Sequence, residues 1–268
     1  MKIASLPMYD LPEITAATDA WWQAIARAML REGIADIPDA LTRGDDYMGP
    51  WGKPDLLFSQ ACGYPFTHDF RSSLRYLATP VYLADGCDGA SYRSFVIVRS
   101  GDPALSLEDL RGRRCAVNGT HSHSGYNILR AMLAPLAAGS PFFSEVKVSG
   151  GHVASLQLVI DNAADAAAID GVTLALVARY RPEMRKAIRV LAPSPLAPGL
   201  PYVTSHKADK ETVRKLRNSI GAALQDPMAR EARMELLIVG IQVLPRNAYA
   251  AIDAFESAAI SAGYPEIR

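Results

Sequence analysis

The sequence predicts an α/β fold divided into two lobes, and three observations support this prediction. Short apolar runs alternate with segments of helical periodicity along most of the chain. The run at 55–59 is almost continuously apolar, as expected for a strand buried on both faces of a parallel sheet. A turn-rich stretch at 84–90 and a proline-rich stretch at 193–201 interrupt the alternation. These two interruptions give the chain two places to cross between lobes.

The expected elements follow from local pattern and punctuation. A helix at 18–31 carries Trp22, Ile25 and Met29 on one face, with Gly33 just beyond its end. Ser106 and Asp109 begin a short helix in the manner of a capping box. Strands are predicted at 2–6, 55–59, 75–82, 93–98, 115–117, 146–148, 164–169 and 188–191. Further helices are predicted after the loop at 118–125 and at 153–161, 172–180, 209–225, 228–237 and 247–262, so the chain beyond 209 is expected to be almost entirely helical.

The alternation of strands and helices predicts that each lobe is a mostly parallel sheet flanked by helices. We assign residues 1–91 and 202–268 to a discontinuous outer lobe, and residues 92–201 to a middle lobe that includes the crossings. In such an architecture a ligand is expected to bind in the cleft between the lobes.

Composition excludes several classes of function. The 268 residues carry 28 basic and 28 acidic side chains, so no overall basic field indicates nucleic acid as a partner. The apolar runs are shorter than the ~20 residues that span a bilayer, so direct membrane insertion is not expected. The first residues lack the apolar core of a secretory signal. As written, the chain is expected to be cytoplasmic; it would be periplasmic if the native N-terminus had been trimmed.

The loop from Asn118 to Gly125 is the segment with the clearest chemistry. It follows the strand at 115–117, contains serines, histidines and glycines, and leads into a helix. The first N–H groups of a helix have no intrahelical partner and carry about +0.5 charge, which favours a small anion. The alternative is an ordinary N-cap in which Ser122 or Ser124 bonds its own helix. The residues of the loop alone leave both interpretations open.

Several segments together resemble a known family. They are Ser59 to Pro65, Tyr92 to Arg99, Leu107 to Arg114, Ser122 to Gly125, Gly151-His152 and Ala168 to Asp170. Their order and spacing resemble the phosphate/phosphonate-binding branch of the ABC-transporter substrate-binding proteins, which have the type 2 periplasmic binding protein fold. The resemblance spans nearly the whole chain. It implies a two-lobed solute-binding protein that closes by a hinge on a small anionic or zwitterionic ligand, without a cofactor, and that works with an ABC-transporter permease or as a cytosolic sensor.

The resemblance also implies the residues of the site. Ser122, His123 and Ser124, with Gly125, would hold the phosphate or phosphonate oxygens, although His123 replaces the serine or threonine usual in the family. The family pattern further matches His152 as a donor to the anion, Asp170 as a partner for a ligand amine, and Tyr64 and Tyr92 as aromatic residues lining the cleft. Asp170 could instead cap the following helix, and the tyrosines could simply pack.

Position in the fold adds two candidates to this set. Tyr9 and Gln60 each follow a predicted strand, where chain turns reach the cleft of open α/β folds.

Two rival functions start from the same residues. His121 and His123, with His152 and Asp170, could ligate a metal ion, but the positive end of a helix disfavours a cation. Ser122 between two histidines suggests a nucleophile, but neighbours in sequence at a helix start rarely face one another. The sequence also lacks a Gly-x-Ser-x-Gly elbow, a Walker A loop and a His-Glu-x-x-His motif. We therefore expect no metal site, and a binding protein rather than an enzyme that uses the same fold.

Overall fold

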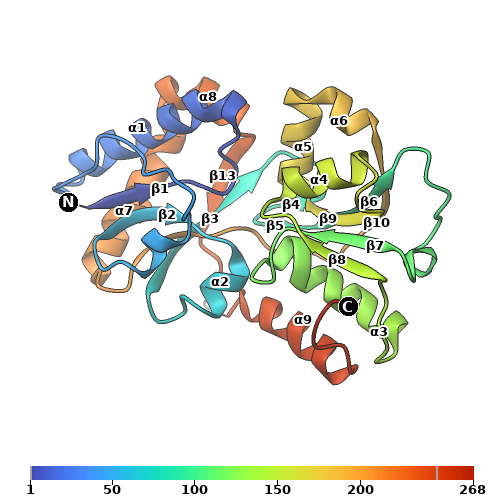
Figure 1. Cartoon of the computed structure of the whole chain (residues 1–268). Coiled ribbons are helices and arrows are strands. Elements are labelled where there is room, and N and C mark those ends of the chain that lie inside the picture. The colour runs from blue at the N-terminus through green and yellow to red at the C-terminus, as the bar shows by residue number, and fades with distance from the viewer. Residues whose placement is uncertain (1, 246) are drawn as a thin grey trace. The chain divides into compact units, whose positions relative to one another are not determined.

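A computed structural model describes residues 2–245 and 247–268, and divides the chain into two compact units (Figure 1). The first unit comprises Met1–Leu83 and Gly199–Arg246, and the second comprises Ala84–Pro198 and Asn247–Arg268. No helix in the described residues is both long enough and apolar enough to span a membrane.

The first unit is a five-stranded sheet flanked by helices. Its strand order is β1-β2-β12-β3-β13. The strands are β1 (Ile3–Ser5), β2 (Leu56–Gln60), β3 (Leu74–Tyr82), β12 (Tyr202–Ser205) and β13 (Ile238–Gln242). The helices are α1 (Thr15–Arg31), α2 (Gly63–Thr67), α7 (Lys210–Gln225) and α8 (Arg230–Glu235), with 3₁₀ turns at Pro12–Ile14, Gly49–Gly52 and Pro227–Ala229.

Aromatic side chains fill the centre of the first unit. Trp21 and Trp22 of α1 are both fully buried, and the ring of Trp22 stacks on Phe58 of β2 at 5.9 Å. The indole N–H of Trp21 donates to the hydroxyl of Tyr202 at 3.0 Å, so this buried polar pair satisfies itself. The predicted core position of Trp22 is therefore confirmed, and Trp21 shares it.

The second unit contains a five-stranded sheet in the order β10-β6-β9-β7-β8 and a small sheet in the order β11-β5-β4. The strands of the larger sheet are β6 (Ser94–Arg99), β7 (Arg114–Val117), β8 (Glu145–Val148), β9 (Ala166–Asp170) and β10 (Ile188–Pro193), and those of the smaller are β4 (Cys87–Asp88), β5 (Ser91–Tyr92) and β11 (Ala197–Pro198). The helical elements are a 3₁₀ turn at Glu108–Leu110, a π turn η4 (His123–Asn127), α3 (Ile128–Ala137), α4 (His152–Ile160), α5 (Gly171–Tyr180), α6 (Pro182–Lys186) and α9 (Ala250–Ser261).

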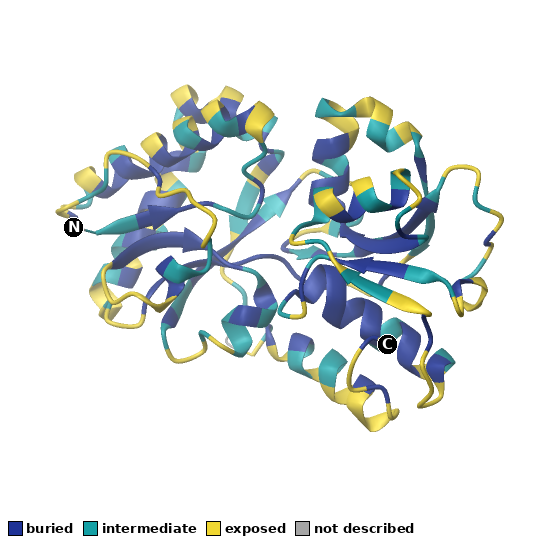
Figure 2. Ribbon diagram, in the orientation of Figure 1, coloured by how far each residue is buried: buried dark blue, intermediate teal, exposed yellow. Residues whose placement is uncertain are grey.

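The central strands β6, β7 and β9 of the larger sheet in the second unit are largely buried, and this part of the sheet is mostly dark blue in Figure 2. Successive strand residues point to opposite faces, so Val96 and Val98 join one core cluster while Ile97 joins the other. The first cluster includes residues of α3 and α9, and the second includes residues of α4 and α5. The sheet is thus a central layer between two layers of helices, as the α/β prediction requires.

The sheets are mixed, whereas the sequence predicted mostly parallel ones. β1 and β2 are parallel, as are β7, β8 and β9, but β12 runs antiparallel to β2 and β3. β3 leads the chain out of the first unit and β12 leads it back in, so these adjacent strands run in opposite directions. In the second unit, β6 is likewise antiparallel to β9 and β10.

Two sequence-based assignments beyond residue 200 were wrong. The region after 209 is not almost wholly helical, because Leu237 adopts φ of 60° and ends the helix, and β13 follows. The segment 247–268 does not belong with the outer lobe. Ala259, Tyr264 and Ile267 are buried in the same core cluster as α3, so this segment folds into the second unit. The unit boundaries also fall at 83/84 and 198/199 rather than at 91/92 and 201/202.

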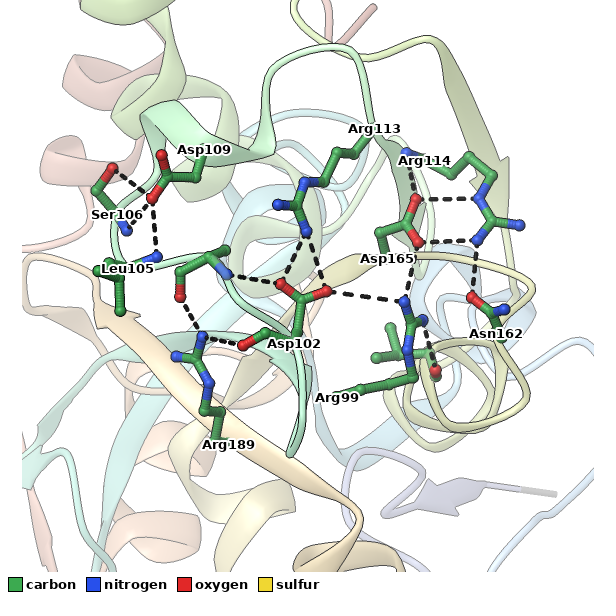
Figure 3. Close-up of polar contacts among 12 residues, drawn as sticks. Arg99, Asp102, Leu105, Ser106, Asp109, Arg113, Arg114, Asn162, Asp165 and Arg189 are labelled. Atoms are coloured by element: carbon green, nitrogen blue, oxygen red, sulfur yellow. Dashed lines mark hydrogen bonds and ion pairs between the residues drawn. The ribbon is translucent and has the colours of Figure 1, made fainter.

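An arginine–aspartate network fixes one edge of the second sheet (Figure 3). Asp165, just before β9, accepts two hydrogen bonds from the side chain of Arg114 at 3.0 and 2.8 Å and one from Arg99 at 3.2 Å. Asp102 accepts a hydrogen bond from the side chain of Arg113 at 2.8 Å. Because β7 and β9 are parallel, these ion pairs hold the edge where both strands begin, and both strands end at the opposite edge.

Candidate functional site

The candidate site lies at the edge of the second sheet where β7 and β9 end. The turn that follows β7 leads into η4 and α3, which form one continuous helical segment from His123 to Ala137. The hydroxyl of Ser122 accepts the backbone N–H of Gly125 at 3.1 Å, and Ser122 is extended, as an N-cap should be. The N–H of Asn127 reaches the carbonyl of Ser122 at 2.9 Å, which widens the first turn to a π turn. The capping interpretation therefore holds for Ser122.

Ser124 has a different partner, on another element. Its hydroxyl lies 2.8 Å from Nε2 of His152, the first residue of α4. The same Nε2 lies 3.3 Å from Oδ2 of Asp170, the last residue of β9. Three segments that are distant in sequence thus converge on one imidazole nitrogen. Ser124, His152 and Asp170 come from the predicted set, and the structure brings them together.

Asp170 combines this contact with capping of α5. Its Oδ1 accepts the backbone N–H of Thr173 at 2.9 Å, and its Oδ2 accepts the Thr173 hydroxyl. The carboxylate is only 2% exposed. The predicted helix cap at Asp170 is therefore confirmed, and its role toward a ligand stays a prediction.

Burial determines the charge of the two site histidines. It lowers the pKa of His123 to about 3. Burial also lowers the pKa of His152, against the opposing effect of the Asp170 charge. Both imidazoles are therefore neutral at pH 7, and each offers one donor and one acceptor. The candidate site therefore combines neutral imidazoles and serine hydroxyls with the start of a helix.

His123 is directed into the second unit rather than sharing the contact between Ser124 and His152. It is 1% exposed, and its Nδ1 lies 3.2 Å from the amide nitrogen of Asn127. Its ring lies between Tyr92, at 6.4 Å, and Phe255, at 5.8 Å. The predicted aromatic Tyr92 thus packs beside the atypical histidine. Because the ring of His123 is neutral, it adds no charge to the candidate site.

Asn118 is a site residue that the sequence analysis did not single out. Its amide nitrogen lies 3.5 Å from Nε2 of His152. Its Oδ1 is buried and has no hydrogen-bond partner within the described residues. A Cβ placed on Gly125 would lie 2.0 Å from that oxygen, so the turn closes only around a glycine at 125. The available signal was its position directly after a strand that leads into a serine-rich helix start.

The remaining predicted residues lie in the first unit. Gln60 donates to the hydroxyl of Tyr82 at 3.0 Å and to the carbonyl of Leu200 at 3.2 Å. Tyr9 packs edge-on against Tyr82 at 5.3 Å. Tyr9, Gln60 and Tyr82 line a cavity of about 20 Å³, enough for one or two water molecules.

Tyr64, also in the first unit, stacks on His68 with ring centroids 3.9 Å apart. The ligand roles of Tyr9, Gln60 and Tyr64 stay predictions.

The geometry does not match the rival sites. In a Ser-His-Asp triad the serine and the carboxylate contact opposite nitrogens of the imidazole, whereas here both contact Nε2 of His152. Within residues 2–245 and 247–268, no three His, Cys, Asp or Glu side chains are grouped so that they could hold a metal ion.

Comparison with known proteins identifies the family. The model of the family described as the periplasmic substrate-binding protein of phosphonate ABC transporters matches residues 50–241. The chain belongs to this family. The resemblance seen in the sequence is thereby confirmed. No match was found among curated proteins.

Solved structures confirm the two-lobed fold of this substrate-binding family. The binding component of an ABC phosphonate transporter from Pseudomonas aeruginosa aligns with a TM-score of 0.77 at 16% identity, over 97% of this chain and 87% of that one. PhnD1 from Prochlorococcus marinus, in complex with methylphosphonate, aligns with a TM-score of 0.73 at 13% identity, over 96% of this chain and 97% of that one. XAC2383 from Xanthomonas citri, bound to ATP, aligns with a TM-score of 0.73 at 15% identity, over 97% of each chain. At these identities the structural matches show the fold, and the ligand of this chain has to be argued from its own residues.

Proposed function

We propose that this substrate-binding protein captures a small phosphonate- or phosphate-like ligand at the turn from Asn118 to Gly125. The observation that carries the proposal is the contact between Ser124 and His152 at a helix start that Ser122 caps. Hydroxyls and a neutral imidazole are hydrogen-bond donors without charge, and the helix start adds partial positive charge. A tetrahedral anion with three oxygens can use donors from several directions at once.

The hydroxyl protons of the serines are suited to this role. Ser122 uses its oxygen as an acceptor for Gly125, so its proton can still be donated to a ligand. Ser124 shares its hydroxyl with a neutral imidazole, whose tautomer can adapt to an incoming acceptor. We infer that both hydroxyls turn toward the anion when it binds.

Asp170 supports a restriction on the charge of the ligand. A buried carboxylate lies 3.3 Å from His152 and therefore borders the same site. A second full negative charge beside it would be repelled, unless the ligand carries a proton or an ammonium group near Asp170. We therefore propose a zwitterionic aminophosphonate or a monoprotonated oxyanion rather than a fully ionised one.

Calorimetric titration and thermal shift test the proposal. Methylphosphonate, an aminoalkylphosphonate, inorganic phosphate and sulfate are compared on the purified chain. A ligand at a hundred times its Kd stabilises by about 2.7 kcal/mol, which is visible as a higher Tm. A ³¹P spectrum of the bound phosphonate should stay unchanged with time, because the site binds and does not react. Consumption of the phosphonate would instead support the enzyme of the same fold.

Ser124→Ala is the direct test of the site. Loss of a hydroxyl that donates to a charged oxygen should weaken binding by about 1–3 kcal/mol. Ser106→Ala is the matched control, since Ser106 also lies at a helix start in the second unit but bonds Asp109 at 3.2 Å. Equal affinities of the two variants would contradict the proposed site, and no binding of any of the four anions would contradict the proposed function.

A further inference from the structure

A chain of buried polar side chains connects the proposed anion-binding turn, Asn118 to Gly125 (the anion turn), to the C-terminal helix α9. His123 Nδ1 lies 3.2 Å from the amide nitrogen of Asn127. Arg130 donates to the Asn127 side-chain carbonyl at 2.7 Å and to Glu256 of α9 at 3.0 Å. The Asn127 amide also donates to the backbone carbonyl of Ile252, on α9, at 3.1 Å. The turn is thus bonded through side chains to a segment more than a hundred residues away in sequence.

Burial makes each of these bonds consequential. Asn127 is fully buried, and His123 and Arg130 are 1% and 4% exposed. A buried polar group without a hydrogen-bond partner destabilises the folded state. Each of these side chains is therefore held in the orientation that keeps its hydrogen bonds. Because the Asn127 amide nitrogen is a donor, His123 Nδ1 must accept, and the imidazole proton lies on Nε2. The orientation of the ring is therefore set by Asn127.

His123 and Asn127 also belong to the helical segment into which the anion turn leads. His123 and Asn127 are the first and last residues of the π turn, and Ser124 and Gly125 lie between them. Whatever fixes both ends of this turn also fixes the position of Ser124 between them. Arg130 adds a second tie, since it also donates to the carbonyl of Pro265 at 2.6 Å.

We propose that Asn127 and Arg130 are positioning residues that tether the anion turn to α9, so that the affinity of the turn depends on Glu256, which lies outside the site. This inference rests on the proposed function. It assigns a role to residues 247–268, which the sequence analysis placed in the other lobe: they hold the binding turn in its competent form.

Glu256→Gln in the full chain is the first test, with methylphosphonate and inorganic phosphate as probes. It keeps the shape of the side chain and removes the charge that holds Arg130. We expect affinity to fall by about three- to tenfold, the value of one hydrogen bond. Amide exchange of the peptide that covers 119–127 should accelerate, whether or not ligand is present.

The double variant Arg130→Met/Glu256→Leu separates positioning from stability. Replacing a buried ion pair by apolar residues of similar size is often neutral for stability, but Asn127 then has no donor for its carbonyl. We expect a Tm at or above that of Glu256→Gln, because no unpaired charge is left buried, with affinity still reduced and exchange at 119–127 still fast. If the double variant has both the affinity and the Tm of the wild type, the inference is overturned.

Asp165→Asn is the matched control because Asp165 belongs to the ion-pair network at the opposite end of β9 (Figure 3). It should lower Tm and leave both affinity and exchange at 119–127 unchanged. A loss of affinity in this variant equal to that in Glu256→Gln would show a general effect of destabilisation and overturn the tether. If the wild type takes neither probe, the proposed function fails, and unchanged exchange in Glu256→Gln would then overturn the tether independently.

Discussion

Gly125 is a position where one methyl group should disrupt the candidate site. Its φ lies outside the left-handed region, so an alanine would not strain the backbone there. The obstacle is space. A Cβ at 125 would lie 2.0 Å from Oδ1 and 2.6 Å from Cγ of Asn118, and 3.1 Å from Cε1 of His152.

The magnitude follows from these distances. Ordinary contact begins near 3.4 Å, so the Asn118 side chain has to move by about 1.4 Å, toward a region that is already filled. Overpacking of this kind costs about 1–3 kcal/mol. Because Asn118 and Ser124 both contact His152, the displacement should also weaken anion binding.

Thermal denaturation and calorimetry of Gly125→Ala check this prediction. We expect Tm to fall by several degrees, at about 2–4 °C per kcal/mol for a domain of this size. Gly101→Ala is the control, because a Cβ at Gly101 meets no atom within 4 Å. Asn118→Ala/Gly125→Ala removes the two closest atoms and should recover much of the Tm. A Gly125→Ala variant as stable as Gly101→Ala, or a double variant that recovers no stability, would disprove the steric clash with Asn118.

Two further predictions concern charge. The guanidinium groups of Arg114 and Arg99 hold the pKa of Asp165 well below its usual value, so the unfolded state takes up a proton first as pH falls. The stabilisation is fully present above the unfolded pKa of about 3.9 and is lost as the pH falls below it. Asp165→Asn should therefore lower the free energy of unfolding near pH 7 and reduce the dependence of that free energy on pH below about 4. Urea titrations at several pH values measure both effects. The lowered pKa of His123, about 3, means that between about pH 6.5 and 3 the unfolded chain binds a proton that the folded chain does not. Stability should therefore fall with acidification by up to about 1.4 kcal/mol per pH unit, and His123→Phe should flatten this slope in the same urea titrations; an unchanged slope would contradict the neutral, buried state of the ring.

Much of the fold could be predicted because its signals are local. The strand predicted at 55–59 and the helix predicted at 18–31 appear in the structure close to their predicted places, as β2 and α1. β12 and β13 were missed because short strands next to a proline-rich connector or a helix end carry little periodicity of their own. Their pairing with β3 is a property of the folded sheet.

The site was predictable in its parts and not in its connections. Ser122, Ser124, His152 and Asp170 stood out by residue type, position and resemblance. Asn118, Asn127 and Arg130 did not, because an asparagine or arginine in a sequence gives no sign of its partner. Their importance comes from burial and from hydrogen bonds to α3, α4 and α9.

The α/β class, the division into two lobes and the serine-containing helix start could be recognised in the sequence alone, because periodicity, turn residues and capping chemistry act over a few neighbouring residues. The folded chain was needed to show which lobe holds the C-terminal helix, which serine caps and which contacts His152, and that both histidines of the candidate site are neutral. These outcomes depend on burial and on contacts between segments distant in sequence, such as Ser124 with His152 or Arg130 with Glu256. No local pattern encodes such a contact.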